Sequence, residues 1–160
     1  MVKYSNIVKL IISIFVCQLA GVLGSIFTMP AIPTWYASLR KPAFSPPNWL
    51  FAPAWTTLYI LMGVSVYLIW SKGLHKPHVK TALAVFLIQL ILNAVWSPAF
   101  FGLRSPLAGF VIIVILWVAI LLTILSFLRI SKAAGLLLIP YIAWVSFAAV
   151  LNCSILILNP

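Results

Sequence analysis

Residues 105–128 read SPLAGFVIIVILWVAILLTILSFL, a run that contains no charged side chain. An α-helix of about 20 apolar residues is long enough to cross the hydrocarbon core of a bilayer. Four similar runs predict further helices at about 10–29, 48–70, 81–101 and 132–158. The expected fold class is therefore an all-α integral membrane protein, a five-transmembrane-helix bundle that forms one domain over residues 1–160.

The overall composition supports a membrane location. Hydrophobic residues make up 65% of the chain and the mean hydropathy is +1.23. A soluble domain of 160 residues could not bury so much apolar surface. Ten Lys and Arg residues and no Asp or Glu give a formal charge of +10. Because these cations lie between the apolar runs, they indicate contact with membrane lipid, and no nucleic-acid partner is expected.

The lack of carboxylates excludes paired acid–base catalysis and makes a carboxylate-bound metal ion improbable. His75 and His78 lie three residues apart in a short basic loop, but no other metal ligand is near them in the sequence. Cys17 and Cys153 each lie inside an apolar run and lack the spacing of a metal or redox motif. We therefore expect no metal site and no disulfide.

The segment between the first two helices, residues 30–47, is rich in proline and aromatic residues. Pro30 and Pro33 are expected to end the first helix, and the prolines within 42–47 should stiffen the loop. Residues 35–39 are predicted to form a short interfacial helix.

The distribution of cations predicts the orientation of the chain. Seven lie on the side of the N-terminus and three on the side of the Pro-rich loop. The positive-inside rule then predicts a cytoplasmic N-terminus, with the Pro-rich loop and the C-terminus on the opposite side. The first group is Lys3, Lys9, Lys72, Lys76, Lys80, Arg129 and Lys132, and the second is Arg40, Lys41 and Arg104.

Three predicted helices each carry polar and aromatic residues on one face at helical spacing. These faces predict either an aromatic ligand pocket or interhelical hydrogen bonds with interfacial anchoring, and spacing alone leaves both open. Small residues in the first helix would let a neighbouring helix approach closely, and they are a candidate dimer interface. The three faces are Trp55, Tyr59 and Gly63; Gln89, Asn93, Trp96 and Phe100; and Tyr141, Trp144, Ala148 and Asn152; the small residues are Ala20, Gly21, Gly24 and Ser25.

Several motifs resemble those of the translocator protein family, also called TspO/MBR, tryptophan-rich sensory proteins or peripheral-type benzodiazepine receptors. The resemblance covers nearly the whole chain in order. The matching segments are Trp35-Tyr36-x-x-Leu39-x-Lys41-Pro42, Pro46-Pro47, Phe51-x-Pro53-x-Trp55-Thr56-x-Leu58-Tyr59-x-Leu61-Met62-Gly63, Leu92-Asn93-x-x-Trp96-Ser97-x-x-Phe100-Phe101-Gly102 and Pro140-Tyr141-x-x-Trp144-x-x-Phe147-Ala148-x-x-Leu151-Asn152.

The resemblance implies a five-helix bundle, usually a homodimer, with a pocket beneath the first loop. It also implies binding of porphyrins such as protoporphyrin IX and of isoquinoline-carboxamide or benzodiazepine drugs. On matching positions, the ligand-binding residues would be Tyr36, Pro46, Trp55, Asn93, Trp144 and Ala148. Most of these residues belong to the three faces described above, and this agreement favours a pocket.

One departure from the family pattern lies near the end of the fifth helix. The proposed cholesterol motif of animal members needs an aromatic residue followed by a basic one, and residues 151–156 supply neither. This argues against a cholesterol role through that segment and fits a microbial member.

The expected function is a membrane receptor or sensor that binds porphyrin-like tetrapyrroles and requires no cofactor. Arg40 or Lys41 could meet a porphyrin propionate at the mouth of the pocket. One alternative is an enzyme that degrades porphyrin in light through Trp55 and Trp144, although no catalytic residue is expected for a receptor. Another alternative is a transporter of tetrapyrroles or small lipophiles, but the chain has no inverted repeat or ion-coupling residue.

Overall fold

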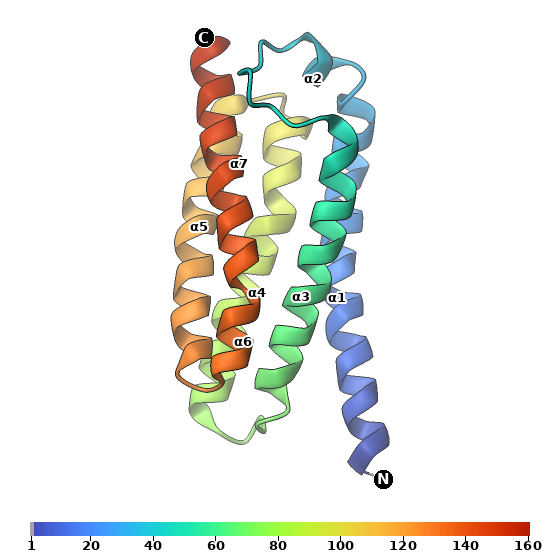
Figure 1. The fold of residues 1–160 in the computed structure, drawn as a ribbon, viewed down its shortest axis with the longest axis vertical. Coiled ribbons are helices and arrows are strands. Elements are labelled where there is room, and N and C mark those ends of the chain that lie inside the picture. Colours follow the sequence, from blue (N-terminus) through green and yellow to red (C-terminus); the bar gives the residue numbers. More distant parts are fainter. Residues whose placement is uncertain (1) are drawn as a thin grey trace.

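The computed structural model describes residues 2–160, with side chains from residue 6 onward, and consists of helices joined by short loops (Figure 1). Five segments are long and apolar enough to cross a membrane: Asn6–Ala31, Asn48–Trp70, Pro77–Gly102, Pro106–Leu128 and Lys132–Leu158. The predicted five-helix membrane fold is therefore confirmed. The elements are α1 (Val2–Ala31), α2 (Trp35–Ser38), the 3₁₀ turn η1 (Asn48–Leu50), α3 (Phe51–Trp70), α4 (Pro77–Ser97), the π turn η2 (Pro98–Gly102), α5 (Pro106–Leu128), α6 (Lys132–Leu137) and α7 (Ile139–Leu158).

The first helix is longer than the sequence predicted. It begins at Val2 instead of near residue 10, because polar and basic residues at the membrane surface do not interrupt helical hydrogen bonding. Pro30 lies in its last turn, so this residue does not end the helix. The chain leaves the helix after Ala31, where Pro33 disfavours a helical conformation for the residue before it.

Prolines also explain two other differences from the predicted boundaries. Pro77 occupies the first turn of α4, where a missing N–H costs little, so α4 begins before residue 81 and includes His78. The predicted fifth helix is divided at Leu138 into α6 and α7. Pro140 lies in the first turn of α7, and it cannot donate the backbone hydrogen bond that a continuous helix would need there.

Close contacts place α1 against both α3 and α4. At Gly63 of α3, an added Cβ would lie 2.5 Å from Cα of Ile14 in α1, so only glycine permits this approach. On the other side, the Ser97 hydroxyl of α4 donates to the carbonyl oxygen of Gly24 in α1 at 2.7 Å. Gly21 faces the ring of Tyr59 in α3. The small residues of α1 thus allow close approach as predicted, and the neighbours of Gly21 and Gly24 are α3 and α4 of the same chain.

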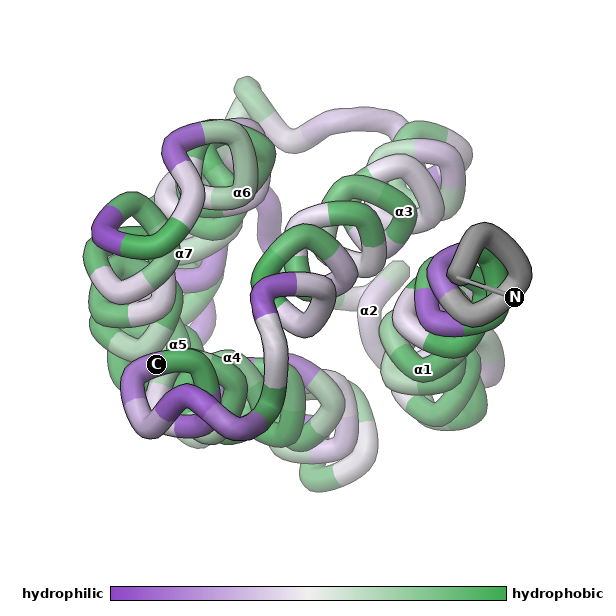
Figure 2. The backbone as a smooth tube through the Cα atoms, turned by 90° about the horizontal axis from the view of Figure 1, so that it is seen from below, coloured by the Kyte–Doolittle hydropathy of each residue, from purple (hydrophilic) through white to green (hydrophobic). Residues whose placement is uncertain are grey.

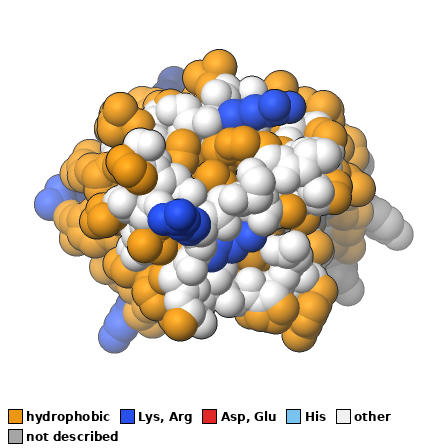
Figure 3. Space-filling view, turned by 90° about the horizontal axis from the view of Figure 1, so that it is seen from above, with side chains coloured by type: hydrophobic (Ala, Val, Ile, Leu, Met, Phe, Trp, Pro, Cys, Tyr) orange, Lys and Arg blue, Asp and Glu red, His pale blue; other side chains and the backbone are white. Residues whose placement is uncertain are grey.

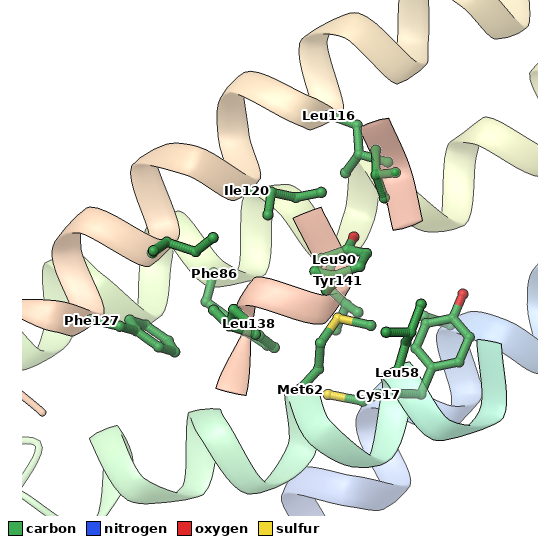
Figure 4. Close-up of a cluster of buried hydrophobic side chains, with 14 of the residues drawn as sticks. Cys17, Leu58, Met62, Phe86, Leu90, Leu116, Ile120, Phe127, Leu138 and Tyr141 are labelled. Carbon is green, nitrogen blue, oxygen red and sulfur yellow. The ribbon is translucent and has the colours of Figure 1, made fainter. Parts of the chain in front are cut away.

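The bundle surrounds an apolar core and has an apolar outer surface. The core brings together α1, α3, α4, α5 and α7 through residues such as Met62, Phe127 and Tyr141 (Figure 4). Seen from below, the helices are coloured mainly hydrophobic along their length, and α1 lies at the edge of the bundle beside α3 (Figure 2). Exposed apolar side chains along the spans suit contact with lipid.

The Pro-rich loop lies across one end of the bundle, at the same end as the C-terminus (Figure 1). Its short helix α2 confirms the predicted short helix at residues 35–39, and the position of this helix at the membrane interface stays a prediction. Asn159, just after α7, accepts a hydrogen bond from the Arg40 backbone N–H at 3.0 Å and donates to the Arg40 carbonyl oxygen at 2.9 Å. These two bonds fasten the loop to the end of α7.

Candidate ligand-binding cavity

A cavity of about 440 Å³ lies beneath the Pro-rich loop, between α1, α3, α4, α5, α7 and the η2 turn. Its volume is within the range of small-molecule pockets in proteins. Aromatic and aliphatic side chains form most of its wall, together with a few amide and hydroxyl groups. The structure brings five of the six predicted ligand-binding residues to this wall: Tyr36, Trp55, Asn93, Trp144 and Ala148.

Two tryptophans from different helices form part of the aromatic wall. Trp55 of α3 stacks on Tyr59, one turn further along the helix, with ring centroids 5.6 Å apart and planes 28° apart. Trp144 of α7 contacts Phe51 edge-to-face at 6.1 Å and lies 5.7 Å from Phe147. Such packing holds each indole in a fixed orientation beside the cavity.

Pro46, the sixth predicted residue, is a half-buried loop residue that the structure does not place among the residues lining the cavity. The loop packs on the bundle through other groups. Phe44 contacts Phe147 of α7 edge-to-face at 6.3 Å, and Arg40 bonds to Asn159. The prolines therefore shape the loop, whereas its aromatic residues make the contacts with the helices.

A buried hydrogen-bond network joins α3, α4 and α7 at the floor of the cavity. The Tyr59 hydroxyl donates to Asn93 Oδ1 at 2.6 Å, and Asn93 Nδ2 donates to the Tyr141 hydroxyl at 2.9 Å. The Tyr141 hydroxyl in turn donates to Gln89 Oε1 at 2.9 Å. Gln89 is thus a packing residue, while Asn93 both lines the cavity and connects three helices.

The network predicts unequal costs for removing its two tyrosine hydroxyls. Tyr141→Phe removes two hydrogen bonds and leaves both Asn93 Nδ2 and Gln89 Oε1 unpaired, so we expect it to lower the free energy of unfolding by about 1–2 kcal/mol. Tyr59→Phe removes only one bond and should cost less. Thermal unfolding of both variants in one detergent would check the order, and an equal or reversed cost would contradict the network.

Three residues that line the cavity each have a buried polar atom without a hydrogen-bond partner among the described residues: Trp96 Nε1, Trp144 Nε1 and Asn152 Oδ1. All three are buried, and an unpaired buried polar atom costs about 1–3 kcal/mol. Asn152 is held in place because its Nδ2 donates to the carbonyl oxygen of Pro106 at 2.8 Å. Its Oδ1 faces Gly109 of α5, where an added Cβ would lie 2.9 Å from it, so the Asn152 amide packs against α5.

Tyr36 closes the loop end of the cavity. It is 4% exposed and packs edge-to-face on Phe100 and Phe101 of the η2 turn, with centroids 6.3 and 5.6 Å away. Burial raises the pKa of the Tyr36 phenol above its ordinary value, so the hydroxyl stays neutral near pH 7 and remains able to donate. The Lys41 ammonium lies 4.5 Å from the centre of the Tyr36 ring, which places a cation above the cavity.

The sequence did not indicate that α1 lines the cavity. Gln18, Gly21, Ser25 and Thr28 all lie on its wall. The small residues in this stretch predicted only close helix packing, and choosing between packing and a cavity wall requires knowing which helices are neighbours. Phe101, adjacent to the predicted Phe100 position, was also missed because a π turn shifts side chains away from regular helical spacing.

The described residues contain no group of three His, Cys, Asp or Glu side chains that could hold a metal ion. His75 and His78 are exposed, and both are remote in sequence from the residues of the cavity wall. Cys17 is buried in the core and Cys153 is partly buried, each as a free thiol. The chemistry that the cavity offers is therefore stacking and hydrogen bonding.

Fold and cavity together define a small multi-pass membrane protein whose helices enclose an aromatic chamber. Residues 13–158 match the TspO/MBR family, and the chain belongs to this family. It is 49% identical to the tryptophan-rich protein TspO of Chlorobaculum tepidum, over 97% of this chain and 98% of that protein. The protein of the same name from Archaeoglobus fulgidus is also 49% identical, over 96% and 99%. The translocator protein of Ovis aries is 41% identical, over 82% and 79%.

Proposed function

We propose that this protein is a membrane receptor or sensor that binds porphyrin-like tetrapyrroles in the cavity beneath the Pro-rich loop. The observation that carries the proposal is that Trp55 and Trp144, from two different helices, line one cavity. A flat apolar macrocycle can stack on both indoles and bury apolar surface against them. The same wall suits isoquinoline-carboxamide compounds, which are flat and carry one polar amide.

The polar groups of the cavity support the same ligand class. Asn93 and Tyr36 lie on the wall and can hydrogen-bond to the edge of a macrocycle. Lys41 lies next to Tyr36, where its charge would attract a propionate.

The proposal includes the placement of the protein in its membrane. The loops that follow α3 and α5 share the end of the bundle opposite the Pro-rich loop (Figure 1). Together with the start of α1 and the first turns of α4 and α6, these loops contain seven of the ten Lys and Arg residues in the sequence. This supports a cytoplasmic N-terminus and a cavity that lies toward the opposite side. From the family resemblance, we further propose that the functional unit is a homodimer surrounded by membrane lipid.

Titration of the purified protein with protoporphyrin IX in detergent tests the proposal. We expect a saturable change in porphyrin absorption with one porphyrin per chain, and an isoquinoline carboxamide should displace the porphyrin. Empty micelles of the same detergent are the control, because porphyrins partition into micelles without protein. A change that does not saturate, or that matches the empty micelles, would show that the cavity does not bind tetrapyrroles.

A further inference from the structure

One side of the cavity reaches the outer surface of the bundle. On α1, the residues that line the cavity include Val22 and Met29, which are 57% and 70% exposed. On α3 and the η1 turn before it, Asn48, Ala52 and Thr56 also line the cavity and are exposed. A residue that is both on the cavity wall and on the surface marks an edge of an opening, so the cavity opens between α1 and α3.

On the side of α1 that faces α4, hydrogen bonds join the two helices and close the cavity wall. The Ser97 hydroxyl of α4 donates to the carbonyl oxygen of Gly24 at 2.7 Å, and its oxygen lies 2.6 Å from the Thr28 hydroxyl. Of the α4 residues that line the cavity, Asn93 and Ser97 are buried and Trp96 is partly buried. The loop-side half of α1 is therefore fastened to α4.

A hydrogen bond marks the end of the opening that is farthest from the Pro-rich loop. Gln18 Nε2 of α1 donates to the carbonyl oxygen of Thr56 in α3 at 3.1 Å. This is the single side-chain hydrogen bond between α1 and α3 within the described part of the chain. Below it, the two helices meet at Gly63, where the Ile14 backbone is too close for a larger residue.

The loop end of the cavity is covered. Asn159 holds the Arg40 backbone through two hydrogen bonds, and Tyr36 is 4% exposed beneath the loop. Seen from above, backbone, uncharged polar side chains and several Lys or Arg side chains extend across this end, with hydrophobic side chains around the outside (Figure 3). A ligand coming from water would have to displace the loop, whereas one dissolved in the bilayer meets the opening between α1 and α3.

We propose that this opening, framed by Val22, Ser25 and Met29 of α1 and by Asn48, Ala52 and Thr56 on the α3 side, is a lateral portal through which a flat lipophilic ligand passes directly between bilayer and cavity. This inference rests on the proposed binding function, and it adds the route by which the ligand reaches the cavity. Polar side chains are costly at a lipid-facing surface. Gln18, Ser25 and Thr56 line the portal, and each donates to a backbone carbonyl oxygen. Their side-chain oxygens are left to accept hydrogen bonds from a ligand in transit.

Narrowing the portal should slow binding in both directions. With the protein in lipid nanodiscs and protoporphyrin IX as the probe, we expect Ala52→Trp to lower the association rate about tenfold, because binding then requires the added indole to move aside. The dissociation rate should fall as well, because the ligand leaves through the same opening. Val22→Trp narrows the portal from the α1 side and tests the same route if Ala52→Trp does not fold.

Two control variants distinguish a blocked portal from a general effect of an added indole and from entry past the loop. Ala143→Trp adds the same side chain at an exposed position of α7 outside the cavity wall, and both rates should remain those of the wild type. Asn159→Ala removes both bonds to Arg40 and loosens the loop, and it too should leave the rates unchanged.

Wild-type rates in Ala52→Trp and Val22→Trp would overturn the portal, and so would faster association in Asn159→Ala, since the ligand would then enter past the loop. Failure of the wild-type protein to bind the porphyrin would instead reject the proposed function itself.

Discussion

Replacing Trp55 and Trp144 together with alanine should weaken protoporphyrin IX binding by about 100-fold or more. Buried aromatic residues in a binding pocket each contribute about 2 kcal/mol or more when truncated, and a tenfold loss of affinity corresponds to about 1.4 kcal/mol. Both indoles line the cavity, and they approach it from α3 and α7. A macrocycle would therefore lose stacking on two sides at once.

The measurement should follow porphyrin absorption, because removing tryptophans also changes the intrinsic fluorescence of the protein. A matched control is the pair Trp49→Ala and Trp70→Ala, which removes two tryptophans outside the cavity wall. Trp49 is 70% exposed, and Trp70 lies near the other end of α3, with Lys9 Nζ 5.8 Å from its ring. Unchanged affinity in the Trp55 and Trp144 variant, or an equal loss in the control, would place the binding site elsewhere.

Gly63→Ala should lower the free energy of unfolding by about 2–3 kcal/mol, the cost of overpacking a close helix contact. An added Cβ at this position would lie 2.5 Å from Cα and 2.9 Å from N of Ile14. Because these are backbone atoms, the clash cannot be relieved by turning a side chain. The two helices must separate, which would also disturb the Gln18 bond to Thr56 just above.

Gly102→Ala is the matched control for this substitution. Its added Cβ would meet Phe27 side-chain atoms at 3.0 and 3.6 Å, and an exposed phenylalanine ring can move aside. Thermal unfolding of both variants in one detergent should show a clear loss for Gly63→Ala and little change for Gly102→Ala. Equal stability of the two variants would contradict the close packing of α1 on α3.

The sequence was sufficient to predict the five spans, because each helix must supply about 20 apolar residues to cross the bilayer. It did not predict where helical backbone begins and ends. Hydropathy reports the surrounding medium, so the helix predicted at about 10–29 leaves out the polar start of α1, although the backbone there is helical. The division at Leu138 had a visible signal in Pro140, but the surrounding apolar run obscured it.

Five of the predicted binding residues lie on the cavity wall, but the sequence could not show how the helices enclose the cavity. Helical spacing placed Trp55, Asn93 and Trp144 on faces with other polar and aromatic residues, and the family resemblance then favoured a pocket. The structure brings all three to one cavity wall. The bond between Asn93 and Tyr141 depends on α4 and α7 lying near each other, and no local pattern reports that. The contribution of Gln18 was missed for the same reason, because it follows from how α1 packs in the bundle.

The most direct test of the central claim is a structure of the protein with protoporphyrin IX bound. We predict a macrocycle beneath the Pro-rich loop, in contact with the rings of Trp55 and Trp144 and with its polar edge near Asn93 or Tyr36. A porphyrin found on the lipid-facing surface of the bundle, with no density between these tryptophans, would contradict the account.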